Sequence, residues 1–217
     1  MSELQQRIRS LFFSFRERRR TPNEIYVSDL TGCFRKAWFA VKFNASPAPS
    51  PAMVSGKLLH HVLRDVLPGD ELFRGAEFEV ECSVPVEGCS GWVLKGKADV
   101  ATVDAVFEFK FTRGLEYNRA HPAYYAQVSA YAFMLGKTKA YLCLVDRESW
   151  DVQVLEAEPD VDLWNSMQAE AKLLVECLGK DEVPKLNSPR LGDWECENCP
   201  WRVICVNLKE AQAVEPV

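Results

Sequence analysis

Long apolar runs are missing from this chain of 217 residues, and no segment approaches the roughly 20 apolar residues that a membrane-spanning helix needs. The first fifteen residues carry charges where a signal peptide needs an unbroken apolar stretch. We therefore expect an intracellular, cytoplasmic protein that has no membrane partner.

An excess of basic charge is also missing. The chain holds 31 acidic residues against 26 lysines and arginines, which gives a net charge of −5 and a pI near 5.4. This balance argues against a broad, non-specific surface for nucleic acid. Six arginines nevertheless lie within the first twenty residues. A basic helix that contacts phosphates and a solvated amphipathic face are equally good interpretations of that segment.

Cysteine is not scarce, since the chain has eight. In a reducing compartment, some of them are expected to bind a metal or cluster and the others to be buried. Cys196, Cys199 and Cys205 follow a C-x2-C-x5-C pattern, in which short loops can bring three thiolates to one centre. Our candidate for the fourth ligand is Cys33, because Gly32 and a helix start leave its thiol accessible. A zinc site and an iron–sulfur cluster both accept four thiolates.

Periodicity predicts helices, then strands, then mixed elements, which favours an α/β fold with a mixed sheet flanked by helices. The last forty residues are predicted to be loop-like. The expected helices cover 3–20, a stretch from Ser28 through 41, Ser55 to Pro68, Pro122 to Gly136, and 160–178. The expected strands cover 76–84, a hairpin within 92–111, 139–146 and 150–157.

The hairpin holds the most informative pattern, an aspartate followed at fixed spacing by a glutamate and a lysine. A turn at Val103–Asp104 would place Asp99 directly across from Glu108, and strand alternation would put Lys110 on the same face as Glu108. Two carboxylates and an ammonium can hold a divalent ion and offset the charge of a phosphodiester under attack. The alternative is an exposed strand face with cross-strand ion pairs. The opposite, buried face would carry Phe107, Phe109 and Phe111.

Two helices offer further polar candidates. His60 shares a helix side with Gly56 and could bind a metal, although a structural histidine is the alternative. A nitrogen ligand beside carboxylates suits Mn²⁺ better than Mg²⁺. Gln127 and Tyr131 lie four residues apart on one helix face, where they could hold a phosphate or orient Lys110.

Taken together, these residues resemble the RecB-like branch of the PD-(D/E)XK nuclease superfamily. The pattern is most similar to CRISPR-associated RecB-type exonucleases that carry an iron–sulfur cluster, and less similar to AddB-type nuclease domains. The motifs follow the family's order and span residues 33 to 205. They are Cys33, G-x3-H at Gly56–His60, G-x2-D at Gly96–Asp99, E-x-K at Glu108–Lys110, Q-x3-Y at Gln127–Tyr131, and the cysteines at 196, 199 and 205.

The resemblance implies a role for each of these residues. Asp99, Glu108 and Lys110 would form the catalytic set, with Lys110 positioning the attacking water or neutralising charge on the phosphate. Gln127 and Tyr131 would help to place the DNA. Mn²⁺ or Mg²⁺ would be bound by His60, Asp99, Glu108 and the backbone carbonyl of Phe109. Cys33, Cys196, Cys199 and Cys205 would hold an iron–sulfur cluster, which is more often [4Fe–4S] in such families, although four thiolates also fit [2Fe–2S].

The same resemblance implies one nuclease domain over 1–217. It has a restriction-endonuclease-like core at 56–157, and the segments 1–55 and 158–217 are packed together and joined by the cluster. The implied activity is a 5′→3′ exonuclease on single-stranded DNA ends, with or without endonuclease activity. It would process fragments for insertion into a CRISPR array beside integrase proteins. The alternatives are an idle DNA-end-binding subunit with a scaffold cluster, a RecB/AddB-like repair nuclease, and a zinc-stapled interaction module. The sequence leaves the oligomeric state open.

Overall fold

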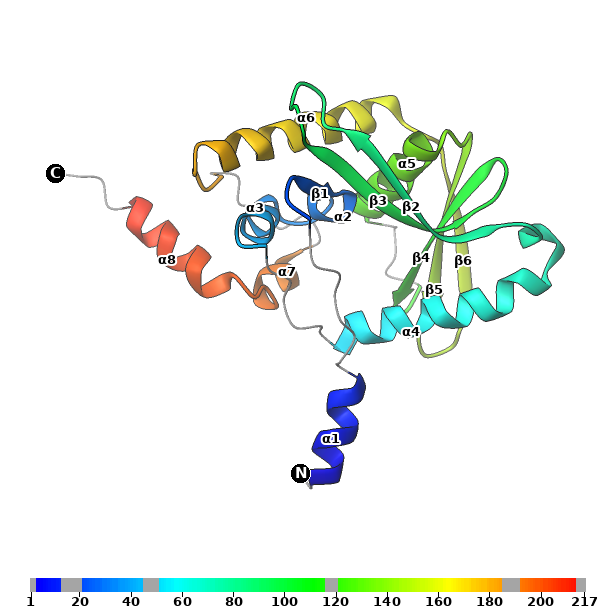
Figure 1. The fold of residues 1–217 in the computed structure, drawn as a ribbon. Helices are drawn as coiled ribbons and strands as arrows, with labels where there is room; N and C mark the ends of the chain where they lie inside the picture. Colours follow the sequence, from blue (N-terminus) through cyan, green and yellow to red (C-terminus); the bar gives the residue numbers. More distant parts are fainter. Residues whose placement is uncertain (1–2, 13–20, 45–50, 116–120, 185–191, 214–217) are drawn as a thin grey trace.

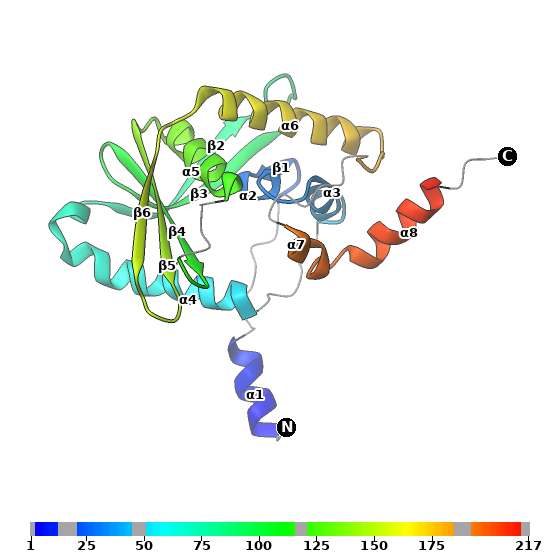
Figure 2. The same cartoon turned by 180° about the vertical axis from the view of Figure 1, so that it is seen from behind.

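A mixed, six-stranded sheet forms the centre of the molecule, with helices on both faces (Figure 1). The computed structural model describes residues 3–12, 21–44, 51–115, 121–184 and 192–213. Helices α5 (Pro122–Leu135) and α6 (Val161–Gly179) cover one face of the sheet and α4 (Pro51–Val66) runs along the other, as the view from behind also shows (Figure 2). The α/β architecture expected from the sequence is therefore confirmed.

The strands leave an opening in the middle of the sheet. Along one edge of β3, β2 pairs antiparallel over the full length of the strand. The other edge is shared, because β1 pairs in parallel with residues 93–95 and β4 pairs antiparallel with residues 100–101. Residues 96–99 of β3 therefore lie where β1 and β4 diverge, and on this edge they pair with neither strand. The strands are β1 (Glu24–Tyr26), β2 (Glu77–Pro85), β3 (Val93–Ala101), β4 (Ala105–Thr112), β5 (Lys139–Asp146) and β6 (Val152–Ala157).

A separate hydrophobic core fills each face of the sheet. Val128 of α5 (Pro122–Leu135) and Met167 of α6 (Val161–Gly179) belong to the larger core. Leu59 of α4 (Pro51–Val66) belongs to the smaller one, with Phe107 and Phe109 of β4. The two faces of β4 are thus committed to different layers, which directs its alternate polar side chains toward α5.

The N-terminal third differs from the sequence prediction in two places, the helix predicted from Ser28 and the start of α4. Helix α1 is described over Glu3–Phe12, and residues 13–20 of the predicted helix lie outside the described residues. The continuous helix predicted from Ser28 is wrong, because two helices form, α2 (Val27–Leu30) and α3 (Phe34–Lys42). Helix α4 begins at Pro51 rather than at Ser55, since the fixed backbone angle of proline suits a first helical turn.

A distant carboxylate explains the break between α2 and α3. The Cys33 N–H donates to Oε1 of Glu195 over 2.8 Å, so it is not available to a continuous helix. Gly32 lies against the same group, and a Cβ at this position would come within 2.7 Å of Glu195 Oε1. Cys33 therefore becomes the N-cap residue of α3.

The loop-like ending predicted for the last forty residues is also wrong. Two helices form there, α7 (Asp193–Glu197) and α8 (Arg202–Ala213). Glu195 anchors α7 to Cys33, and between the helices Trp201 stacks on Phe39 and Phe43 at ring distances of 5.6 and 5.4 Å. These tertiary contacts are not visible in local periodicity.

The remaining regular elements follow the prediction closely. Helix α5 ends at Gly136, whose φ of 63° is the left-handed conformation that favours glycine. Helix α4 ends at Val66, close to the predicted end at Pro68, and two short 3-10 helices follow it, η1 (Leu67–Gly69) and η2 (Glu71–Phe73). Across the described part of the chain, no helix has the length and apolar character needed to cross a membrane.

Replacing Glu195 tests the hydrogen bond that joins α7 to the start of α3 at Cys33. Glu195→Ala removes the acceptor of the buried Cys33 N–H, and we expect a loss of about 1–3 kcal/mol in the free energy of unfolding. Urea denaturation measures this value. Glu197→Ala on the exposed side of the same helix is the matched control and should stay within about 0.5 kcal/mol of the unmodified protein. Equal losses for both variants would contradict the anchoring role.

Candidate functional site

The predicted hairpin forms and brings the two acidic residues together. Val100 pairs with Phe107 and Ala101 with Val106, and Asp99 and Glu108 are the next residues on their strands, just beyond the last of these pairs. Residues 102–104 form the turn, which is closed by the Thr102 N–H donating to the Ala105 carbonyl over 2.9 Å. The phenylalanines occupy the opposite face as expected, with Phe107 and Phe109 buried and Phe111 packed against the same core.

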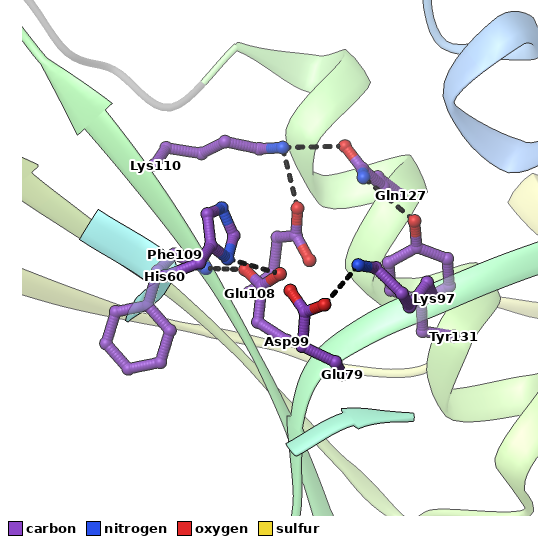
Figure 3. Close-up of polar contacts among 9 residues, drawn as sticks. All are labelled: His60, Glu79, Lys97, Asp99, Glu108, Phe109, Lys110, Gln127 and Tyr131. Carbon is purple, nitrogen blue, oxygen red and sulfur yellow. Dashed lines mark hydrogen bonds and ion pairs between the residues drawn. The ribbon is translucent and has the colours of Figure 1, made fainter. Parts of the chain in front are cut away.

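Asp99 is held in place through both of its carboxylate oxygens. Oδ2 accepts the Phe109 N–H over 2.7 Å, and Oδ1 lies 3.0 Å from Nδ1 of His60 on α4 (Figure 3). Burial lowers the pKa of His60, but the hydrogen bond and charge of Asp99 outweigh this effect and leave that pKa raised. The imidazole thus brings positive character to the carboxylates when it is protonated.

Glu108 is nearly inaccessible to solvent, at 3 % exposed. Its Oε1 accepts from Lys110 Nζ over 2.6 Å, whereas its buried Oε2 has no hydrogen-bond partner among the described residues. Burial, followed by the charge of Asp99, raises the pKa of Glu108 to about 7, against the opposing effect of Lys110. An orphaned carboxylate oxygen is costly to bury, and a bound cation would satisfy it.

Lys110 is positioned by a chain of hydrogen bonds from α5. Its Nζ also donates to Oε1 of Gln127 over 2.9 Å, and Nε2 of Gln127 donates to the Tyr131 hydroxyl over 2.9 Å (Figure 3). Burial lowers the pKa of Lys110, but the charge of Glu108 more than compensates and leaves it raised, so the side chain is an ammonium. In this arrangement Gln127 orients Lys110, and Tyr131 orients Gln127.

The oxygen and nitrogen donors of Asp99, Glu108 and His60 suit a divalent cation, although they are not arranged as a complete metal site. Within the described ranges, no group of three or more His, Cys, Asp or Glu side chains is gathered closely enough to hold a metal ion. Asp99 directs its oxygens at His60 and Phe109 instead. The free Oε2 of Glu108 is the observation that fits a cation, because carboxylate oxygens are the ligands that Mg²⁺ and Mn²⁺ prefer.

The four predicted cluster cysteines lie in the same part of the fold, with Cys33 at the start of α3, Cys196 in α7, Cys199 between α7 and α8, and Cys205 in α8. Over the ranges that the structure describes, they are not gathered closely enough to hold a metal ion. Burial raises the pKa of the Cys199 thiol, and nearby Cys33 and Cys196 add to the effect while Lys36 opposes it. Cys205 accepts a hydrogen bond from Nη1 of Arg35 at 3.6 Å. The predicted accessibility of Cys33 is wrong, since α7 covers it and leaves it 6 % exposed.

Sequence reasoning missed two charged residues beside the centre, Glu79 of β2 and Lys97 of β3. They form an ion pair on the Asp99 side of the sheet (Figure 3). The alternation of apolar and acidic residues within 76–84 predicted a solvent-facing Glu79, but it did not indicate that Glu79 pairs with Lys97. The spacing of Lys97 and Asp99, two residues apart on one strand, was the available signal that both side chains share a face.

Comparison with known proteins decides the class of this site. A model of the PD-(D/E)XK nuclease superfamily matches residues 11–206. The chain belongs to the PD-(D/E)XK nuclease superfamily. The acidic pair and the lysine described above therefore lie in a chain of a nuclease superfamily. No curated protein sequence matches this nuclease.

Solved structures resemble this nuclease over most of their length. The protein SSO0001 has a TM-score of 0.65 and 26 % identity, with 93 % of each chain covered. An alkaline exonuclease, LHK-Exo from Laribacter hongkongensis, has a TM-score of 0.56 and 13 % identity, covering 79 % of this chain and 93 % of its own. A complex of LHK-Exo with dAMP has a TM-score of 0.53 and 13 % identity, covering 72 % and 92 %. At 13 % identity, the likeness to LHK-Exo concerns the fold alone.

Replacing either of two motif glycines, Gly96 and Gly56, by alanine is expected to change the stability of the fold in opposite directions. A Cβ at Gly96 would lie 2.5 Å from Cε1 of Tyr131 and 3.0 Å from Sγ of Cys82, so Gly96→Ala should destabilise the fold by about 1–3 kcal/mol. A Cβ at Gly56 would meet nothing within 4 Å, so Gly56→Ala on α4 should stabilise it by about 0.5–1 kcal/mol. Thermal unfolding of both variants checks the pair. An undiminished stability of Gly96→Ala would contradict the tight packing against Tyr131, and a destabilised Gly56→Ala would contradict the open space on α4.

Proposed function

We propose that this nuclease is a metal-dependent DNA exonuclease whose reaction centre consists of Asp99, Glu108 and Lys110. The observation that carries the proposal is the buried Oε2 of Glu108, which has no partner within the described part of the chain and lies beside a second carboxylate and an ammonium. A structural ion pair would satisfy both carboxylate oxygens. A site in which Oε2 of Glu108 lacks a positive partner is suited to bind a cation.

The ligands proposed for Mn²⁺ or Mg²⁺ are His60, Asp99, Glu108 and the carbonyl of Phe109. When bound, the ion would supply a more acidic water and neutralise charge at the phosphate. The chain's own contribution is to hold its donors still. The Phe109 N–H and the His60 imidazole fix Asp99, while Lys110 fixes one oxygen of Glu108 and leaves the other free.

Lys110 is suited to stabilise negative charge that develops on the phosphate. It remains an ammonium in the free protein, so it acts as a hydrogen-bond donor and a positive charge rather than as a base. Gln127 and Tyr131 hold it at the centre, and both are buried. Their part in placing the DNA is therefore proposed to run through the position of Lys110.

The proposed substrate is DNA with a free single-stranded end, digested 5′→3′, with or without endonuclease activity. The exonuclease LHK-Exo, of similar fold, was solved with the nucleotide dAMP, which supports a nucleotide product for this chain as well. The order of motifs from Cys33 to Cys205 supports a role in CRISPR spacer acquisition beside integrase proteins. A [4Fe–4S] cluster on the four cysteines and a single domain over 1–217 belong to the same proposal.

Cleavage of end-labelled single-stranded DNA with Mn²⁺ tests the centre. The unmodified protein should degrade the strand, and Lys110→Ala should lower the rate by about 100-fold or more because a charge at the reacting phosphate is lost. Lys180→Ala, an exposed lysine beyond α6, is the control that should cleave normally. The position of the label gives the polarity. No cleavage by the unmodified protein would leave an idle DNA-end-binding subunit.

Metal analysis of the purified protein tests the cluster. Cys199→Ala should remove the iron and the brown colour, whereas Cys89→Ala, which lies in the turn between β2 and β3, should keep both. Glu108→Ala should leave the colour intact while abolishing cleavage. A colourless protein that contains zinc would replace the iron–sulfur proposal with a four-thiolate zinc site.

A further inference from the structure

We propose that Lys97 binds a backbone phosphate of the DNA strand beside the one that is cut, with Glu79 as its positioning residue. This inference rests on the proposed function in that it takes a nucleic-acid strand as the ligand of the site. It assigns a phosphate subsite to two residues that none of the motifs specifies, since Lys97 occupies a variable position of G-x2-D.

The backbone at Glu79 is the first observation. Glu79 sits in the middle of β2 with a φ of 54°, which is the left-handed conformation that non-glycine residues rarely adopt. Its neighbours pair regularly, Phe78 with Val100 and Val80 with Ala98, so the register places Glu79 opposite Asp99. Backbone strain of this kind costs about 1–3 kcal/mol and is concentrated at functional sites.

The distorted backbone directs the Glu79 carboxylate to Lys97. The two side chains form an ion pair, in which the Glu79 side chain is 34 % exposed and the Lys97 side chain 47 % exposed. Glu79 also borders the small pocket that is lined by His60 and Asp99. Glu79 therefore lies at the edge of this pocket, and Lys97, its ion-pair partner, keeps much of its surface open to solvent.

The second observation is that Lys110 and Lys97 differ in their contacts and in their exposure. Lys110 uses its ammonium on Glu108 and Gln127, and its side chain is only 23 % exposed. Lys97 lies two residues before Asp99 on the same face of β3, roughly 7 Å along the strand. An ammonium has three donors, so Lys97 can keep Glu79 as a partner and still donate to a phosphate.

Electrostatics favour this assignment over a bare surface ion pair. Glu79, Asp99 and Glu108 place three carboxylates around the centre, in a chain whose net charge is −5. The ammonium of Lys110 lies against Glu108, and Asp99 has the imidazole of His60 beside it, so the charge of Glu79 is the one that these two cationic groups do not contact. A half-exposed ammonium held beside Glu79 offsets that charge where the next phosphate of the strand would lie.

Binding of a fluorescent single-stranded oligonucleotide to the full chain, without added divalent metal, tests the inference by anisotropy at several salt concentrations. Lys97→Ala should raise the Kd roughly three- to tenfold and reduce the slope of log Kd against log salt by about 0.7, the value of one phosphate contact on a single strand. Lys97→Arg should restore most of the affinity. The matched control is Lys139→Ala, which breaks a similar exposed pair with Asp104 at the far end of the hairpin and should leave the Kd unchanged.

A double-mutant cycle with Glu79→Gln separates positioning from simple structure. If Glu79 acts through Lys97, the effects of Glu79→Gln and Lys97→Ala on the Kd will be non-additive. With Mn²⁺, Lys97→Ala should raise KM and leave kcat near that of the unmodified protein. An unchanged Kd and salt slope in Lys97→Ala, or additive effects in the cycle, would overturn the inference while cleavage by the unmodified protein upholds the exonuclease. Lys97-dependent binding without any cleavage would uphold the phosphate subsite and overturn the exonuclease.

Discussion

Two carboxylates enclosed beside one ammonium form the constraint on which the rest of the structure depends. Asp99 and Glu108 can share this space because, among the residues that the structure describes, every charge there except one oxygen of Glu108 has a donor or a counter-charge close by. The sheet makes the room by letting β1 and β4 share an edge of β3. Helices on opposite faces then supply His60 and Gln127, so both layers of the fold are needed to complete one site.

The predictable part of the fold is the part that local sequence determines. The β3–β4 hairpin follows from alternation around a polar turn, and α5 from a proline start and a glycine end. Strand β1 has only three residues, too few for any period to register. The break before Cys33 depends on Glu195, which lies 162 residues further along the chain. No window of neighbouring residues contains that information.

The candidate site divides in the same way. Strand alternation was enough to group Asp99, Glu108 and Lys110, and helical spacing was enough to pair Gln127 with Tyr131. The sequence could not show that Gln127 orients Lys110, because that contact joins a strand to a helix from a different part of the chain. Nor could it show the left-handed backbone of Glu79, since an isolated glutamate in an alternating strand carries no sign of strain. Which polar groups remain unsatisfied is a property of the assembled layers.

The cysteine-bearing end of the chain is already held against α3 by contacts that need no metal. Glu195 accepts the Cys33 N–H, Trp201 stacks on two phenylalanines, and the buried Arg35 donates to both the Pro184 carbonyl and the Cys205 sulfur. Aromatic pairs of this kind add about 0.5–1.5 kcal/mol each beyond their buried area. A cluster on these cysteines would therefore fix segments that are packed beforehand. The guanidinium of Arg35 would then stand beside a sulfur that carries negative charge as a ligand, which offsets part of the cost of burying that charge.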